Sequence, residues 1–257
     1  MKQEARKITS IEKTLAILLT FAPHNQELGT VEISQKLGFH KATVSRILLT
    51  LMKSAFLEQN PQTRKFRLGA SILSLGSAAR HSLKTNMVQI AKPHIDELRD
   101  RLRETIVLEA LSGKNTFMAY IAEGPRRVRI AGTLGDRLPI YAAAGAKAIL
   151  AFSLPEVVEN LLDQEMPRLT PNTITDPRIL KRQLKVIRHQ GFSYDNEEID
   201  IGISAVGAPI FNHEDKPVAA LVVAGPSQRV TWGSGSAIVP LLKDTAAKIS
   251  AQLYYEQ

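Results

Sequence analysis

The sequence contains no cysteine among its 257 residues, and no stretch approaches eighteen consecutive apolar residues. Without cysteine, disulfide bonds, zinc–thiolate sites and thiol nucleophiles are excluded. The charged first residues are followed by an amphipathic segment that is broken by charge, and not by the apolar core of a signal peptide. We therefore expect no membrane-spanning helix, no signal peptide and a cytoplasmic location.

The positive charge is unevenly distributed along the chain. The net charge is +8, and residues 1–85 contain 13 Lys and Arg against 5 Asp and Glu. Residues 86–257 contain 20 residues of each sign and are therefore neutral. A cationic excess confined to one segment is typical of nucleic-acid binding, because Lys and Arg make most phosphate contacts.

The same basic segment has the pattern of a winged helix-turn-helix. The spacing predicts two short helices separated by a turn at Gly38, residues 30–37 and 41–53. The second helix has apolar residues at three- and four-residue spacing, which predict one buried face: Val44, Ile47, Leu48 and Leu51. Two strand-like pieces joined by a polar turn follow, residues 56–59 and 64–68. This arrangement predicts a module that binds double-stranded operator DNA.

The remaining face of the second helix is polar and contains no acidic residue. Arg46 has the chemistry to read guanine or to bind phosphate, and pairing with an acid of its own domain is the alternative. The N-terminal end of this helix favours phosphate, although a capping role is equally compatible with His40. The predicted DNA-binding residues are His40, Lys41, Thr43, Ser45, Arg46 and Thr50 in the helix, and Arg64 and Lys65 in the wing.

Periodicity also predicts the rest of the chain. A first helix is expected to bury one stripe: Ile11, Leu15, Leu18 and Leu19. Helical segments fill residues 70–103. The second half predicts strands at 105–111, 116–123, 128–133, 205–211 and 217–224, and helices at 145–152, 155–162, 176–190 and 237–255. An antiparallel sheet flanked by helices is an α+β domain, which commonly holds a small ligand.

Two sets of residues carry a family resemblance. The first is Lys41–Leu51 with the end of the wing, Phe66–Gly69. The second comprises Gly191–Glu198, Gly202–Phe211 and Val218–Arg229, supported by Arg137–Ala142 and Lys147–Ala151. In this order they resemble the IclR (isocitrate-lyase-regulator) family of bacterial transcription regulators over nearly the whole chain.

The resemblance implies a complete domain organisation. It predicts a winged helix-turn-helix at residues 1–69, a helical linker at 70–86, and a GAF-like effector-binding and oligomerisation domain at 87–257. Members of this family work as dimers or dimers of dimers. They repress or activate catabolic operons in response to small organic acids or aromatic compounds.

The resemblance also implies an effector site, lined by Ala144, Gly145, Ala146, Asp195, Ala205, Val222 and Ala224. Members that bind acids carry Cys at the position of Ala205 and hydroxyl residues at those of Val222 and Ala224. Without these groups a buried carboxylate would be left unpaired, which is unfavourable. We therefore expect a larger, aromatic or partly apolar effector, acids of that kind included, and not a very small acid such as glyoxylate.

Two other function classes stay open at this point. One is a helix-turn-helix protein whose second domain only forms oligomers. The other is an enzyme, but Gly202–Gly207 lacks the Gly-x-Ser-x-Gly pattern, the region of Lys147 lacks the P-loop pattern, and the six histidines are scattered. We expect no catalytic residue, metal site or cofactor. The acidic residues 195–200 are either a solvated loop or part of the effector site.

Overall fold

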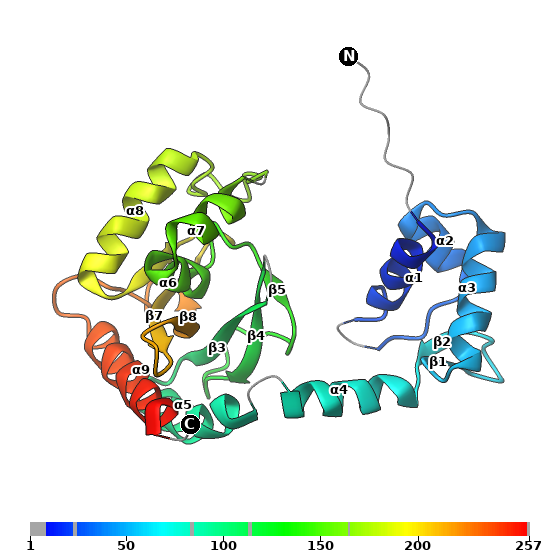
Figure 1. Ribbon diagram of the computed structural model, residues 1–257, viewed down its shortest axis with the longest axis horizontal. Coiled ribbons are helices and arrows are strands. Elements are labelled where there is room, and N and C mark those ends of the chain that lie inside the picture. The colour runs from blue at the N-terminus through cyan, green and yellow to red at the C-terminus, as the bar shows by residue number, and fades with distance from the viewer. Residues whose placement is uncertain (1–8, 23–24, 83–84, 113–114, 164, 256–257) are drawn as a thin grey trace, which may run out of the picture. The chain divides into compact units, whose positions relative to one another are not determined.

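The structure, a computed structural model, describes residues 9–22, 25–82, 85–112, 115–163 and 165–255. The chain separates into two compact units, Met1–Lys84 and Thr85–Gln257, which are considered one at a time (Figure 1).

The N-terminal unit is a winged helix-turn-helix. Its elements are α1 (Ser10–Leu19), α2 (Thr30–Leu37), α3 (Lys41–Lys53), β1 (Leu57–Gln59), β2 (Phe66–Leu68) and α4 (Ala70–Ser82). Strands β1 and β2 form an antiparallel pair, which together with its turn we call the wing. Gly38 has a φ of +67° at the C-terminal end of α2, so the predicted stop is confirmed.

The core of this unit confirms the predicted inner face of α3. The buried residues of that helix are Val44, Ile47, Leu48 and Leu51. They pack with residues from the other elements, Ile17, Phe21, Ile33, Leu57 and Phe66. The polar face of α3 is consequently directed away from the core.

The predicted inner stripe of α1 is wrong for three of its four residues, whereas the fourth, Leu18, is partly buried against the core. Ile11, Leu15 and Leu19 are 73%, 55% and 61% exposed, and the helix buries Ile17 instead. Apolar residues occur on two sides of this helix, one with Ile11, Leu15 and Leu19 and the other with Ile17. Helical periodicity alone does not say which of the two sides packs on the core.

The C-terminal unit is an α+β domain. Its helices are α5 (Thr85–Leu102), α6 (Ala144–Phe152), α7 (Pro155–Leu162), α8 (Pro177–Gln190) and α9 (Ile238–Tyr255). Its strands are β3 (Thr105–Ser112), β4 (Asn115–Ala122), β5 (Arg137–Leu138), β6 (Ser193–Asn196), β7 (Ile203–Phe211) and β8 (Pro217–Pro226). They form one antiparallel sheet in the order β5-β4-β3-β8-β7-β6.

Helices cover both faces of this sheet (Figure 1). Helices α5 and α9 pack on one face, where alternate strand residues such as Leu108, Val206 and Leu221 form the main core. Helix α6 packs on the opposite face against β7 and β8, and α8 packs on α6. Because strand residues alternate between faces, the residues between those core positions face α6.

Two strand predictions need correction. Residues 128–133 do not form a strand, and the short strands β5 and β6 were not predicted. The carbonyl of Ile130 accepts from the Thr105 hydroxyl at 2.7 Å, and that of Val128 accepts from Arg229 at 2.9 Å. Side chains therefore satisfy two carbonyls of this segment that a neighbouring strand would otherwise pair. None of the described helices is long and apolar enough to span a membrane.

Candidate DNA-reading surface and effector site

The exposed face of α3 carries the predicted DNA-binding residues of that helix. His40, Lys41, Arg46 and Thr50 are exposed, while Thr43 and Ser45 are half-buried. His40 is also the N-cap, since its Nδ1 accepts from the Ala42 backbone N–H at 3.4 Å. The capping role is thus present in the structure.

Arg46 is available to a ligand. The ion pairs found among the described residues of the N-terminal unit join Lys65 to Glu32 and Arg67 to Glu58. Arg46 takes part in neither, so the alternative in which a neighbouring acid neutralises it has no support within that part of the chain. Thr50 donates its hydroxyl to the Arg46 carbonyl at 2.9 Å, which leaves the hydroxyl oxygen as an acceptor.

Glu27 holds the wing in shape. Its carboxylate accepts from Asn60 Nδ2 at 2.7 Å and from Thr63 Oγ1 at 2.9 Å. These bonds lower the pKa of Glu27. Arg64 follows in the left-handed region with a φ of +58°, which turns the chain into β2 with its side chain exposed.

Lys65, the other residue of the wing that is predicted to contact DNA, forms an ion pair with Glu32 of α2. Its Nζ lies 2.8 Å from Glu32 Oε1, and the two side chains are 40% and 46% exposed. An ion pair as exposed as this one contributes little to stability. A DNA phosphate can therefore compete for Lys65 at small cost.

In the C-terminal unit, the fold brings most of the predicted effector residues together from separate segments, whereas Ala146 packs in the neighbouring core around Leu150. Asp195 on β6 lies opposite Ala205 on β7, and Ala205 lies opposite Ala224 on β8. Ala144 of α6 joins Ala205, Val222 and Ala224 in one apolar cluster. Gly145 lies against Val222, where an added Cβ would come within 2.9 Å of Val222 Cγ2. Small residues thus let the first turn of α6 approach the sheet closely.

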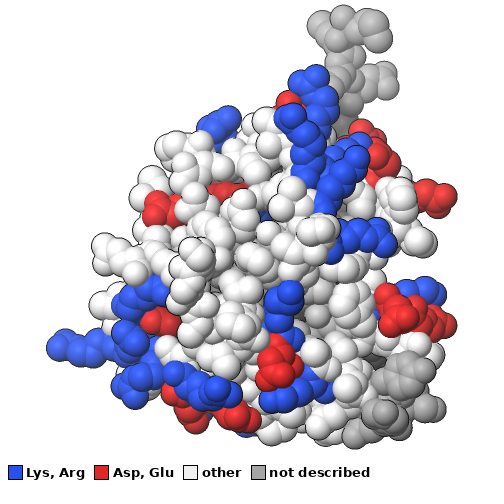
Figure 2. All heavy atoms as spheres, turned by 90° about the vertical axis from the view of Figure 1, so that its left-hand side faces the viewer, with Lys and Arg blue, Asp and Glu red and all other residues white. Residues whose placement is uncertain are grey.

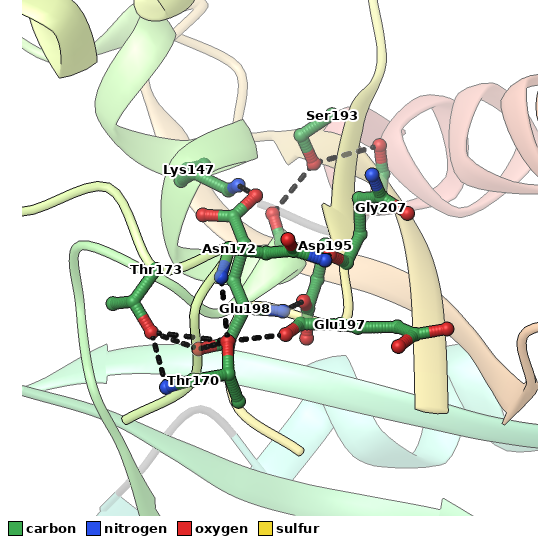
Figure 3. A network of polar contacts seen from close by, with 11 residues as sticks. Lys147, Thr170, Asn172, Thr173, Ser193, Asp195, Glu197, Glu198 and Gly207 are labelled. Atoms are coloured by element: carbon green, nitrogen blue, oxygen red, sulfur yellow. Dashed lines mark hydrogen bonds and ion pairs between the residues drawn. The ribbon is translucent and has the colours of Figure 1, made fainter. Parts of the chain in front are cut away.

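A buried polar network borders this cluster (Figure 3). Lys147 of α6 and Glu198 are both fully buried, and Nζ lies 2.5 Å from Glu198 Oε1. Asp195 Oδ1 accepts from the Glu198 backbone N–H at 2.6 Å. Thr173 and Thr170 donate their hydroxyls to the carbonyls of Glu198 and Glu197. The network therefore ties residues 170–173 and 195–198 to α6.

The solvated-loop interpretation of residues 195–200 is wrong for its two buried members, because Asp195 and Glu198 are 3% and 2% exposed. Burial raises the pKa of Asp195 to about 7. Burial also raises the pKa of Glu198 and lowers that of Lys147, while their mutual attraction opposes both effects. The two side chains are paired with each other and shielded from water.

Sequence reasoning missed Glu109, Thr170 and Thr173. It considered Glu198 only as one of the acidic residues 195–200, and Lys147 only as part of a phosphate loop whose pattern is absent. Glu109 lies in the middle of β3 and is 3% exposed. Burial raises the pKa of its carboxyl to about 8, against the opposing effect of the Ala146 and Gly145 backbone N–H groups. The sequence does contain a signal for Glu109, because it is the one charged residue in the otherwise largely apolar strand of residues 105–112.

The face of the molecule drawn in Figure 2 has mixed charge, with Lys and Arg beside Asp and Glu at several places around a broad uncharged area. Within the described ranges, no group of three or more His, Asp or Glu side chains is arranged to hold a metal ion.

A winged helix-turn-helix with an open, acid-free helix face, followed by an α+β domain, defines a DNA-binding transcriptional regulator. Family comparison assigns it further. Residues 10–61 match the IclR helix-turn-helix domain, and residues 80–251 match the C-terminal domain of the bacterial transcriptional regulator IclR. The chain belongs to the IclR family.

Known relatives agree with this assignment over most of their length. The chain is 31% identical to the HTH-type transcriptional regulator XynR of Escherichia coli, over 87% of this chain and 88% of that protein. It is 28% identical to the HTH-type transcriptional regulator KdgR of Escherichia coli, over 99% and 96% respectively.

Solved structures show the same fold. An IclR homologue from Microbacterium hydrocarbonoxydans, in complex with 4-hydroxybenzoate, superposes with a TM-score of 0.80 at 25% identity, covering 95% of this chain and 99% of that one. An IclR regulator from Alicyclobacillus acidocaldarius superposes with a TM-score of 0.79 at 29% identity, covering 96% and 99%.

Proposed function

We propose that this regulator reads its operator with α3 in the major groove and the wing on the flanking backbone. The observation that carries the proposal is the exposed, acid-free face of α3 around Arg46. The eight residues assigned to DNA from the sequence all lie in α3, in its N-cap or in the wing. The cationic excess of residues 1–85 supplies the long-range attraction to DNA.

The test uses DNA from the promoter next to the gene and the full-length chain. We expect Arg46→Ala to weaken operator binding by about tenfold or more, since one good base contact provides roughly 1–3 kcal/mol. The matched control is Arg182→Ala, which removes an exposed arginine of α8 in the C-terminal unit. Equal affinities of Arg46→Ala and the parent chain would remove Arg46 from the reading surface.

The regulator acts as a homo-oligomer, a dimer or a dimer of dimers. In support, α1 presents Ile11, Leu15 and Leu19 on one exposed stripe, which a second copy can cover. Two winged units related by a twofold axis match the half-sites of a pseudopalindromic operator.

The C-terminal unit binds a small organic effector at the cluster of Ala144, Ala205, Val222 and Ala224, beside Asp195. The apolar cluster accepts an aromatic or partly apolar body, and the buried polar network provides orientation. In support, a relative with this fold was solved in complex with 4-hydroxybenzoate, an aromatic compound. Through α4, which we assign to the predicted linker of residues 70–86, the effector changes DNA affinity by preferring one conformation. The protein works on a catabolic operon in the cytoplasm.

A thermal-shift screen of aromatic and aliphatic metabolites tests effector binding. A ligand at a hundredfold excess over Kd stabilises the folded state by roughly 2.7 kcal/mol, which is readily measured. A compound that shifts Tm and also changes operator affinity supports the proposal. Firm DNA binding without a shift for any compound favours the alternative, a C-terminal domain that only assembles oligomers.

A further inference from the structure

Glu109 is a carboxyl without a cationic partner in the middle of the sheet. It lies on β3, opposite Met118 of β4 and Ala220 of β8. Its side chain is fully buried, and its Oε2 has no hydrogen-bond partner among the described residues. An unpaired buried carboxyl is costly, so its presence calls for an explanation.

The carboxyl lies at the N-terminal end of α6. The N-cap of this helix, Ala143, contributes no side-chain hydrogen bond. The Gly145 and Ala146 backbone N–H groups face Glu109 and favour its ionised form. A Cβ at residue 145 would collide with the Glu109 carboxyl, so the glycine makes room for it. Glu109 already occupies the place where this helix end would attract the carboxylate of a ligand.

The surrounding charges are also predominantly acidic. Lys147 is the cation of the site, and it is committed to Glu198 at 2.5 Å. Asp195 is the titratable group whose charge acts directly on Glu109, and it raises the pKa further. The neighbours of Glu109 from β4 and β8 are Met118, Ala220 and Val222, which carry no charge. The described part of the site therefore contains one cationic side chain, Lys147, and three carboxyl groups, those of Glu109, Asp195 and Glu198.

We infer that the effector carries a cationic hydrogen-bond donor, such as an amine, which donates to Glu109 Oε2 while its apolar body packs on the cluster around Val222. Val107, Ala205, Val222 and Ala224 form the apolar wall beside this carboxyl. The inference rests on the proposed effector site and narrows its ligand class. A carboxylate placed there would find the Gly145 and Ala146 backbone N–H groups already facing Glu109, and it would be repelled by Glu109 and Asp195 whenever these are ionised.

Binding of an amine has a distinctive proton signature. Burial holds the pKa of Glu109 at about 8, so Glu109 is mostly protonated in the empty site at pH 7. A bound ammonium group ionises it, so one proton is released and affinity rises by up to about tenfold per pH unit between pH 6 and 8. A carboxylate ligand requires the protonated form, so its affinity falls over the same range.

The probes are benzylamine, benzyl alcohol and benzoate, which share a ring and differ in charge. Binding to the full-length chain is followed by calorimetry in phosphate and in Tris, which reveals proton exchange from the difference in heat. We expect benzylamine to bind most tightly at pH 8, with release of a proton. Glu109→Gln should reduce its affinity by about tenfold or more and abolish the proton release. Glu156→Gln, an exposed acid of α7, should change neither.

Tighter binding of benzoate than benzylamine to the parent chain overturns the inference, as does the absence of binding by all three probes. The proton measurement on the parent chain decides the matter even where Glu109→Gln fails to fold. Operator affinity is measured separately. If benzylamine binds with proton release but leaves operator affinity unchanged, the result supports a cationic ligand and contradicts the proposed control of DNA binding by that ligand. If benzoate binds more tightly than benzylamine and changes operator affinity, the result supports control by an effector and contradicts the inference that the effector is cationic.

Discussion

At the scale of single residues, the C-terminal unit depends on charges that are removed from water. Lys147 and Glu198 are 0% and 2% exposed and pair at 2.5 Å. The attraction between two such charges offsets the cost of burying them only while both are present. The pair therefore specifies where residues 195–198 attach to α6 more than it adds net stability.

Replacement of one partner should be far more harmful than replacement of both. We expect Lys147→Met to lower the free energy of unfolding by about 3–5 kcal/mol, because it leaves Glu198 buried without a counter-charge. The double variant Lys147→Met with Glu198→Gln should recover most of that loss. Urea unfolding followed by fluorescence of Trp232, the single tryptophan, reports the C-terminal unit alone. Equal losses in the single and double variants would contradict a coupled pair.

Glu109 and Asp195 should make stability depend on pH. Their folded-state pKa values of about 8 and about 7 lie above the ordinary values of 4.5 and 3.8. Between these limits the folded state binds more protons than the unfolded state, so the free energy of unfolding falls as pH rises from about 5 to 8. Glu109→Gln should reduce this slope by up to about 1.4 kcal/mol per pH unit. A parent chain with the same stability at pH 5 and pH 8 would refute both shifts.

At the scale of elements, the wing depends on a contact from outside it. Glu27 precedes α2, yet it accepts hydrogen bonds from both Asn60 and Thr63 in the turn between β1 and β2. A three-residue strand pair is marginal by itself, so such a contact is needed to hold the turn. Together with the left-handed Arg64, it determines where the basic side chains of the wing are presented.

Removal of the Glu27 carboxylate should weaken DNA binding even though Glu27 is not among the residues predicted to contact DNA. We expect Glu27→Ala to lower operator affinity by roughly fivefold, since the two hydrogen bonds that order the turn of the wing are lost. Glu58→Ala is the matched control, because it also removes one acid from this region but only frees the exposed Arg67. Electrophoretic mobility shifts at constant salt compare the two. If both variants bind alike, the wing does not need Glu27.

At the scale of the whole molecule, the proposed oligomer contact would link assembly to DNA reading. The exposed stripe of Ile11, Leu15 and Leu19 belongs to the same compact unit as α3. A contact through α1 would therefore control the spacing of two recognition helices. Half-site spacing in the operator follows from that geometry.

A charge placed on this stripe should disrupt assembly and DNA binding together. We expect Leu15→Lys to reduce the molar mass measured by light scattering and to lower operator affinity, despite its added positive charge. Ile201→Lys, at an isoleucine that is 74% exposed in the C-terminal unit, is the control and should leave both unchanged. Unchanged mass for Leu15→Lys would place the oligomer contact elsewhere.

Local patterns were sufficient for most elements. Val44, Ile47, Leu48 and Leu51 identify the inner face of α3 because a helix that packs on one side must repeat at 3.6 residues. The boundaries of α8 follow from Asp176 as N-cap and Gly191 in the left-handed region. Segment 128–133 has the β propensity of a strand, but two of its carbonyl groups accept hydrogen bonds from the side chains of Thr105 and Arg229. These two donors are distant in sequence, so no local pattern predicts them.

The sequence by itself determined the winged helix-turn-helix, the α+β class, the family and the segment that carries the positive charge, because these follow from spacing and composition. Only the tertiary structure decided which stripe of α1 stays exposed and that Asp195, Glu198 and Lys147 are buried together. It also placed Glu109 of β3 against the first turn of α6. Burial and partnership depend on which distant segments meet, and that is a property of the folded chain and not of neighbouring residues.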